Sequence, residues 1–421
     1  MKHHSFQIAL FVACLMATFA ADRIARASDH ADPIIVRFLG QPESNLTGLF
    51  AFEAKDKLVV ALCARPGLAD TLVDLKPLTF NIHIDTDSRI SFHKKQLDDE
   101  GRTYRYGGWI HEPDNISEDL SIQFRFDSFR KNPFEKVRFG DAISITPKLK
   151  TSFDDNRKKK QAFEQQLRTW VGLRDDPFIL HGFSTTNVVA MVVEIPFEFL
   201  GDNREILIWG TAEKYGKPID HVGRTLRTML PRFDFLNTLH PKDHVKAIRE
   251  RHEAPGVAQD LMRYFAGPFF GIRHYDFEPD VVVFSQARWH AHAADRKKKP
   301  NEIDINDYDM VAFPNGRRLT DDVALLMRDR GDALLYEVST AEAHADHKLR
   351  PTQNGSDYLS EFPYLAPPNE NPTVPEMPHL RWRTIFVLAL VGLAVLSFFA
   401  LPWILYWRAR KKIRRLESAS A

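Results

Sequence analysis

The feature that most constrains this chain is an uncharged apolar run near its C-terminus, from Thr384 to Trp407. About 20 apolar residues suffice to cross a bilayer as a helix, so the run predicts one transmembrane helix over 384–407. Aromatic residues gather towards the two ends of the run, as they do at membrane interfaces: Trp382, Trp403, Tyr406 and Trp407. The strongly basic tail over 408–421 follows at once and, by the positive-inside rule, places the C-terminus in the cytoplasm.

The N-terminus carries an export signal. Lys2 precedes an apolar run over 6–21, and Ala25-Arg26-Ala27 offers small residues at a cleavage point. This pattern is typical of a secretory signal peptide, here 1–27, whose removal leaves Ser28 as the first residue. We therefore expect a single-pass protein of the cell membrane with an exported N-terminal ectodomain on the periplasmic or extracellular face. Its expected partners are the membrane and other membrane or periplasmic proteins.

The composition excludes several classes of protein. With 44% hydrophobic and 27% charged residues the chain is neither wholly disordered nor fibrous. A formal net charge of +1 argues against nucleic acid as a partner, because phosphate binding leaves a basic footprint. Of the two cysteines, Cys14 falls in the signal peptide, so Cys63 has no intramolecular disulfide partner. The alternating residues around Cys63 predict a buried strand position, and the ectodomain must be held together by core burial.

Between its two ends the sequence predicts mainly β structure. Short runs rich in β-branched and aromatic residues predict strands over 49–52, 57–64, 79–84, 120–126, 188–195, 205–210 and 280–284. Helical insertions are predicted over 157–170, 241–265 and 319–327. We expect a β-sandwich-like ectodomain with these insertions over 28–362, either one domain or two packed halves with a boundary near 185–215. Six prolines between 363 and 378 predict an extended Pro-rich stalk over 363–383.

Common catalytic signatures are missing from the sequence. It contains no G-x-S-x-G nucleophile elbow, no P-loop, no G-x-G-x-x-G and no H-E-x-x-H. Together with the predicted anchor, this favours a non-enzymatic, membrane-tethered binding or accessory protein. Two alternatives stay open: a metal-binding or metal-handling protein, and a hydrolase or oxidoreductase whose residues converge only in three dimensions.

Two pairs of acidic residues are candidate calcium ligands. Asp85 and Asp87 close the strand predicted over 79–84, and Asp175 and Asp176 close the first predicted helix. Carboxylates on adjoining loops supply the hard oxygen ligands that Ca²⁺ prefers. The alternative is structural, because aspartate often caps turns by bonding its own backbone.

Histidines suggest a second kind of metal site. Cleavage after Ala27 creates the N-terminus Ser28-Asp29-His30, whose amine, backbone amides and imidazole can hold Cu²⁺ or Ni²⁺ in a square plane. The alternative is an N-terminal segment packed on the sandwich, with His30 bonded to backbone. The pairs His290–His292 and His344–His347 are candidate ligands for Zn²⁺ or Cu²⁺, and the alternative for each is ordinary polar surface.

Six stretches in order together resemble an exported bacterial family, the "domain of unknown function 4331" proteins. They are 28–33 (SDHADP), 80–87 (FNIHIDTD), 172–178 (GLRDDPF), 208–211 (IWGT), 313–323 (FPNGRRLTDDV) and 362–368 (FPYLAPP). The resemblance covers nearly the whole expected ectodomain. It implies an exported, β-rich protein from a bacterium, and it supplies no reaction.

Overall fold

The computed structural model describes residues 46–64, 75–91, 95–97, 103–105, 109–127, 143–144, 147–153, 155–177, 187–202, 204–224, 233–253, 277–291, 315–320, 358–368 and 406. Apart from Tyr406, all of them belong to one compact unit that spans Arg26–Pro375. The predicted signal peptide and basic tail, and all of the predicted membrane helix except Tyr406, lie outside the described residues. Within the described part of the chain, no helix combines the length and apolar character needed to span a bilayer.

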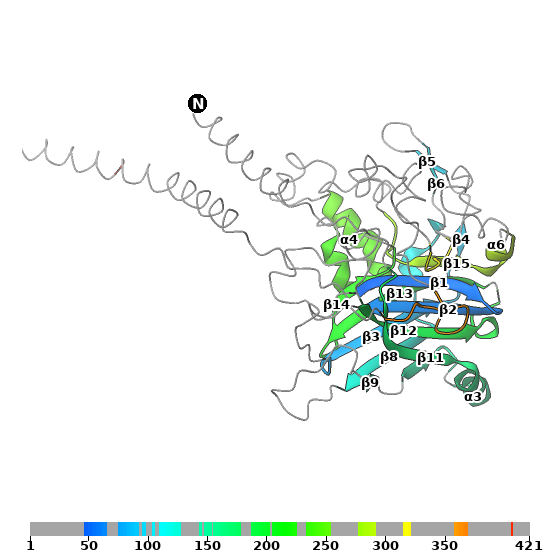
Figure 1. Ribbon diagram of the computed structural model, residues 1–421. Coiled ribbons are helices and arrows are strands. Elements are labelled where there is room, and N and C mark those ends of the chain that lie inside the picture. Colours follow the sequence, from blue (N-terminus) through cyan, green and yellow to red (C-terminus); the bar gives the residue numbers. More distant parts are fainter. Residues whose placement is uncertain are drawn as a thin grey trace, which may run out of the picture. The chain divides into compact units, whose positions relative to one another are not determined.

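The compact unit is mainly β, as the sequence predicts, and its principal strands form two antiparallel sheets (Figure 1). The four-stranded sheet has the order β1 (Leu46–Ala54), β2 (Lys57–Ala64), β12 (Asn187–Pro196), β11 (Arg168–Asp175). The seven-stranded sheet has the order β10 (Lys148–Thr151), β8 (Leu120–Asp127), β3 (Leu78–Asp85), β13 (Glu205–Lys214), β14 (Lys217–Val222), with β9 (Ile143–Ser144) beside β8 and β15 (Val282–Ser285) beside β13. Two short ladders pair β4 (Ile90–Ser91) with β7 (Trp109–Ile110) and β5 (Lys95–Leu97) with β6 (Thr103–Arg105).

A shared hydrophobic core joins the inner faces of the two main sheets. Leu62 and Met191 come from the four-stranded sheet, Phe80 and Ile208 come from the seven-stranded sheet, and all four are fully or almost fully buried. A Cβ atom at Gly210 of β13 would lie 2.6 Å from Cδ1 of Leu62, so glycine allows the two sheets to approach closely there. Each large apolar side chain in this core stabilises the fold by about 1.5–3 kcal/mol. The sandwich is therefore held by burial, as a chain with one core cysteine requires.

The outer face of the four-stranded sheet is covered by residues 358–368, which we call the strap. Tyr364 and Leu365 of the strap pack in a second core together with Cys63, whose predicted burial is confirmed. The first part of the predicted stalk over 363–383 therefore belongs to the fold, because its apolar side chains cover this face. The Pro-rich composition alone did not reveal this.

The predicted boundary near 185–215 does not divide the fold. β12 lies in this region and pairs with β2, while β13 lies there and pairs with β3. Each sheet thus combines strands from both sides of the proposed boundary. A split into two halves would break both sheets, so the described unit is one domain.

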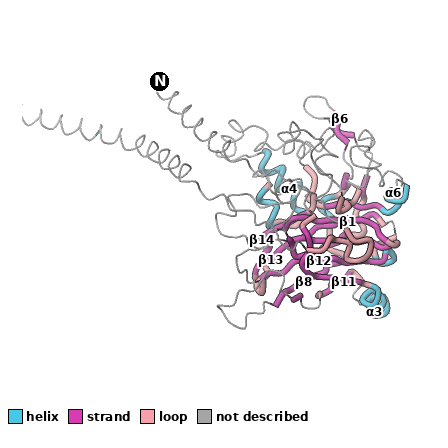
Figure 2. The backbone as a smooth tube through the Cα atoms, in the orientation of Figure 1, coloured by secondary structure: helices cyan, strands magenta, loops and turns pink. Residues whose placement is uncertain are grey.

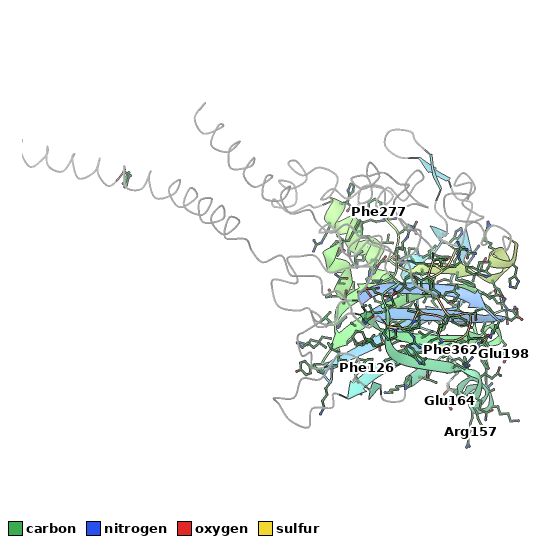
Figure 3. All side chains as sticks on the ribbon, in the orientation of Figure 1. Phe126, Arg157, Glu164, Glu198, Phe277 and Phe362 are labelled. Atoms are coloured by element: carbon green, nitrogen blue, oxygen red, sulfur yellow. The ribbon has the colours of Figure 1, made fainter. Side chains whose placement is uncertain are left out.

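The helical segments lie at the margins of the sheets (Figure 2). They are η1 (Pro113–Asn115), α3 (Arg157–Gln166), η3 (Phe197–Phe199), η4 (Asp234–Thr238), α4 (Pro241–Glu253) and α6 (Gln286–Ala291). The helix predicted over 157–170 is correct only up to Gln166, because β11 begins at Arg168 and pairs along its whole length with β12. Figure 3 shows Arg157 and Glu164 of α3 pointing away from the sheets, and both are exposed.

Candidate functional site

The outer face of the seven-stranded sheet brings together polar side chains from neighbouring strands. Side chains alternate along a strand, so β3 turns Ile82 into the core and Asn81 and His83 outward. The antiparallel register places Trp209 of β13 opposite His83 and Thr211 opposite Asn81. Two stretches of the family resemblance, FNIHIDTD and IWGT, therefore lie side by side on paired strands.

Thr211, His83 and Glu118 lie in contact, one after the other, across this face. Thr211 Oγ1 lies 2.8 Å from His83 Nε2, and His83 Nδ1 lies 3.1 Å from Glu118 Oε1. Asn81 Nδ2 also donates to Thr211 Oγ1, at 3.1 Å. His83 Nδ1 also lies 3.3 Å from Ser121 Oγ, so both ring nitrogens of His83 have polar neighbours.

Aromatic contacts connect these residues to a second histidine. The rings of His83 and Trp209 are stacked, with centroids 5.2 Å apart, and His240 meets Trp209 edge-on at 5.5 Å. His240 Nε2 also lies 3.8 Å from Glu118 Oε1. We call these five residues, Thr211, His83, Glu118, Trp209 and His240, the His83 network. His83 and Trp209 are buried and Thr211 is half-buried, whereas the side chains of Glu118 and His240 are 28% and 26% exposed and form the rim.

Burial keeps both imidazoles of the network neutral. It lowers the pKa of His83 to about 3, with further lowering from the nearby His221, His240 and Lys150. Burial also lowers the pKa of His240 to about 4, helped by Lys242. The pKa of Glu118 is raised by burial, while Lys150 and Lys242 oppose that rise. The rim therefore combines a carboxyl group with two exposed lysines in a partly desolvated setting.

A second pair of histidines holds α4 against the sheet. His221 Nε2 lies 2.7 Å from the carbonyl oxygen of Asp280, whose backbone N–H donates to His244 Nδ1 at 3.1 Å. His221 and His244 are fully buried, with ring centroids 5.0 Å apart. Because His240 lies one residue before α4, this buried pair also positions His240 on the rim of the His83 network.

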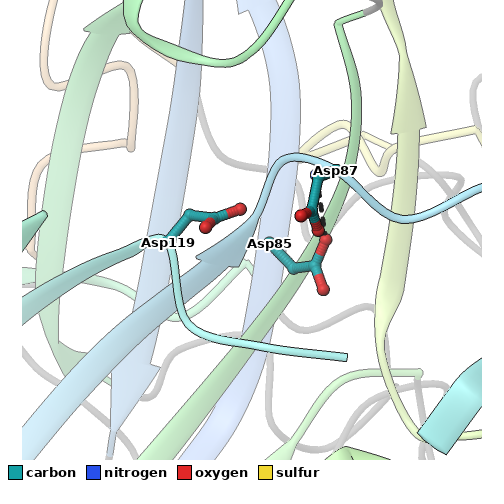
Figure 4. A group of neighbouring side chains, drawn as sticks. All are labelled: Asp85, Asp87 and Asp119. Atoms are coloured by element: carbon teal, nitrogen blue, oxygen red, sulfur yellow. Dashed lines mark hydrogen bonds between the residues drawn. The ribbon is translucent and has the colours of Figure 1, made fainter. Parts of the chain in front are cut away.

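Three carboxylates gather where β3 ends, as Figure 4 shows. Asp85, Asp87 and Asp119 each offer one oxygen within 4.8 Å of the others, and no other trio of possible metal ligands meets this test within the described ranges. Asp85 and Asp87 were predicted from the sequence. Asp119 was not, because it comes from the loop before β8 and reaches the group only through the pairing of β3 with β8.

Hydrogen bonds explain most of this acidic group. Asp85 Oδ1 accepts from the backbone N–H of Asp87 and of Ser88, and Oδ2 accepts from Ser88 Oγ and from the N–H of Ser117. Asp119 Oδ2 accepts from the N–H and the hydroxyl of Thr86. Burial raises the pKa of Asp85, and these bonds oppose the rise. The structural alternative, turn capping, therefore accounts for Asp85, and calcium binding here stays a prediction.

Replacing Asp85 by asparagine distinguishes the two roles. We expect D85N to lower the free energy of unfolding by about 1–2 kcal/mol, because one amide oxygen cannot replace two carboxylate oxygens that accept four bonds. The loss should be equal in chelator and in calcium, measured by denaturant unfolding of the full chain in detergent. A loss that appears only with calcium present would instead identify an ion site.

The second predicted acidic pair lies elsewhere. Asp175 and Asp176 are buried at the end of β11 and follow a strand, not the predicted helix. Asp175 pairs with Asn187, and this end of the four-stranded sheet lies opposite the end of the sandwich where Asp85 sits. The expectation that the two acidic pairs share adjoining loops is therefore wrong.

Of the predicted histidine ligands, only His290 lies among the described residues. The strand predicted over 280–284 ends at Ser285, and His290 lies in α6 with Nε2 2.6 Å from Glu53 Oε1. His292, the pair His344–His347 and the copper or nickel site at Ser28, Asp29 and His30 lie outside the described residues.

Comparison with known proteins identifies no match for this chain. No family model, no curated protein and no solved structure matches this chain. The resemblance to the "domain of unknown function 4331" proteins therefore stays a prediction.

Proposed function

We propose that this chain is an exported, membrane-tethered binding protein that holds a small polar ligand at the rim of the His83 network. The observation that carries the proposal is the series of contacts in which the buried His83 joins Thr211 to Glu118. Contacts with His83 and His240 place the carboxyl group of Glu118 at the rim before any ligand arrives. Preorganised polar groups of this kind give a binding site its specificity.

The rim suggests the chemistry of the ligand. Lys150 and Lys242 are exposed and close enough to Glu118 to influence its pKa. Lysine ammonium groups attract a carboxylate or a phosphate, whereas Glu118 and the neutral His240 suit a hydroxyl or an amine. A small anion that also carries hydroxyl groups would satisfy both sets, so a hydroxy acid or a sugar phosphate is the ligand class that fits best.

A hydrolase is the second candidate, because a hydroxyl, an imidazole and a carboxylate in series are the parts of a nucleophilic triad. The pKa of His83 weighs against it. A general base works best with a pKa near the operating pH, and a value of about 3 makes His83 a weak acceptor for the Thr211 proton. Covalent labelling of Thr211 by a fluorophosphonate, read by mass spectrometry, would favour the hydrolase over the binding protein.

The tether is supported by the predicted signal peptide, the Pro-rich segment and the apolar run over 384–407. An anchored ectodomain keeps its binding site close to other membrane or periplasmic proteins, which suits an accessory role in a larger complex. Flotation of the full chain with vesicles after alkaline washing tests this part of the proposal. Recovery in the aqueous fraction would contradict it.

Ligand binding is tested by thermal unfolding of the detergent-solubilised full chain with a panel of hydroxy acids, sugar phosphates and neutral sugars. We expect at least one anionic hydroxylated compound to raise Tm, and we expect E118Q to lose that rise. The matched control is E198Q, which removes an exposed carboxylate on η3 and should keep the full rise. A rise that survives in E118Q would place the ligand elsewhere, and the absence of a rise with every compound would contradict the proposed ligand class.

A further inference from the structure

The turn between β13 and β14 holds an aromatic ring out in solvent. Tyr215 and Gly216 form this turn, and both have positive φ angles, of 53° and 75°. Two such residues in a row are typical of the tight hairpin turn whose twist matches the flanking strands. Tyr215 is 79% exposed, more than any other large hydrophobic side chain in the described part of the chain. Its backbone N–H donates to the carbonyl oxygen of Pro77 at 3.0 Å, which fixes the turn against the neighbouring segment.

Lysines surround this ring. Lys214 and Lys217 flank the turn and lie opposite each other in the ladder of β13 and β14. Lys76 lies on the adjoining segment beside Pro77. Lys76 and Lys217 are exposed, and Lys214 is half-buried. We call Lys76, Lys214, Tyr215 and Lys217 the basic tip. The nearest acidic residue on the same strand, Glu213, points to the sheet face, where it accepts a hydrogen bond from Asn81.

Ala366 of the strap lies at the same end of the sandwich as the basic tip. Leu46, at the start of β1, donates its backbone N–H to Asp220 of β14 at 2.9 Å, a few residues from Lys217. In the register of the four-stranded sheet, Leu46 lies opposite Ala64, which lies opposite Val189, which in turn lies opposite Leu173. Just beyond that row, Asp175 donates to the carbonyl oxygen of Ala366 in the strap at 3.3 Å. The end of the strap therefore meets the four-stranded sheet on the side where the basic tip lies.

We propose that the basic tip rests on anionic lipid headgroups of the membrane that anchors the chain. This inference rests on the proposed tether and adds to it a defined orientation of the ectodomain. Tyrosine and lysine are the side chains that favour the headgroup region, and each lysine near an anionic surface contributes about 1 kcal/mol. Residues 369–383 in an extended Pro-rich conformation span about 45 Å, which allows this contact and keeps the local concentration of lipid high.

The test places a fluorescent label on the basic tip of the full chain reconstituted into vesicles. Tyr215→Cys carries the label, and Asp56→Cys is the matched control, because Asp56 is an exposed positive-φ residue in the β1–β2 turn. That turn lies at the opposite end of the sandwich. Cys63 is fully buried and does not compete for the label. Brominated phosphatidylcholine in the vesicles quenches labels that touch the membrane.

We expect quenching at position 215 and none at position 56 when the vesicles contain phosphatidylglycerol. Replacing Lys76, Lys214 and Lys217 by glutamate in the labelled chain should remove the quenching, because each lysine changes membrane affinity on the order of fivefold. Three results would overturn the proposal: equal quenching at both positions, undiminished quenching in vesicles of phosphatidylcholine alone, or no quenching at 215 in vesicles that carry the protein.

The test separates this inference from the proposed tether. A chain that floats with the vesicles without quenching at 215 keeps its anchor and loses the lipid contact. A chain that does not float contradicts the tether itself. Protection of the label in native membranes but not in vesicles would identify an acidic protein at the basic tip and overturn the lipid contact.

Discussion

Acidification from about pH 7 to about pH 5 is expected to lower the free energy of unfolding by about 2 kcal/mol, because His83 is held neutral in the fold. The pKa of His83 is about 3 in the folded protein against an ordinary value of 6.5. Below 6.5 the unfolded chain therefore binds a proton that the folded chain does not. Well above pH 6.5 His83 is neutral in both states and stability does not depend on its titration. Below that pH the loss of stability grows as the pH drops, and it reaches a limit of about 5 kcal/mol near pH 3.

Two neighbours of His83 modify this pH dependence. His240, with its pKa lowered to about 4, acts in the same direction, and its partial exposure makes its share smaller. The raised pKa of Glu118 acts in the opposite direction, because proton uptake by Glu118 favours the folded state as the pH approaches that raised value. Glu118 therefore offsets part of the loss that His83 causes, and comparison with H83Q isolates the His83 part.

The measurement is denaturant unfolding of the full chain in detergent at a series of pH values. H83Q should be less stable at neutral pH, and its stability should change much less between about pH 7 and pH 5. H252Q is the matched control, because His252 is exposed near the end of α4 and its replacement should leave the wild-type slope unchanged. Parallel curves for wild type and H83Q would show that His83 is not the source.

The local sequence pattern predicted the strands of the core correctly. It failed where the structure depends on pairing between strands. The runs that became β2, β3, β8, β12 and β13 contain enough β-branched and aromatic residues to read as strands without any partner. Residues 157–166 are charged helix formers, and the helix prediction ran on into 168–170. There Thr169 and Trp170 favour a strand, and the pairing of β11 with β12 settles the outcome.

Part of the candidate site could be predicted from the sequence. The alternation in Phe80–Asp85 places Asn81, His83 and Asp85 on one face, and the two-residue spacing of Trp209 and Thr211 does the same for β13. The sequence does not reveal which strands become neighbours. Glu118 and Asp119 join their partners through the β3–β8 pairing, so neither carried a local signal.

Replacing Arg168 by methionine is expected to cost about 3 kcal/mol, because Arg168 neutralises a carboxylate that the fold has removed from water. The side chain of Glu194 is 1% exposed. Its Oε2 accepts from Arg168 Nη1 at 2.9 Å and lies 3.8 Å from Lys57 Nζ, and its Oε1 accepts from the Tyr364 hydroxyl at 2.6 Å. Without Arg168 the buried charge keeps only the more distant lysine and one hydroxyl.

The double variant R168M/E194Q isolates the charge. Glutamine keeps an acceptor for Tyr364 and carries no charge, so the double variant should recover much of the stability that R168M loses. The matched control is K55M, which breaks the ion pair of Lys55 with Glu361, two exposed side chains, and should cost less than about 1 kcal/mol. Equal losses for R168M and K55M would show that the burial of Glu194 does not matter.

Replacing Tyr364 by phenylalanine extends this argument from stability to orientation. Tyr364 attaches the strap to the sheet through Glu194, and burial together with that hydrogen bond raises the pKa of its hydroxyl. Y364F should cost about 2 kcal/mol and should open the strap locally, seen as faster amide exchange over 358–366 than in the strands beneath it. If the basic tip rests on lipid, a loosened strap lets the ectodomain turn, and quenching at position 215 should fall without any change at the tip itself.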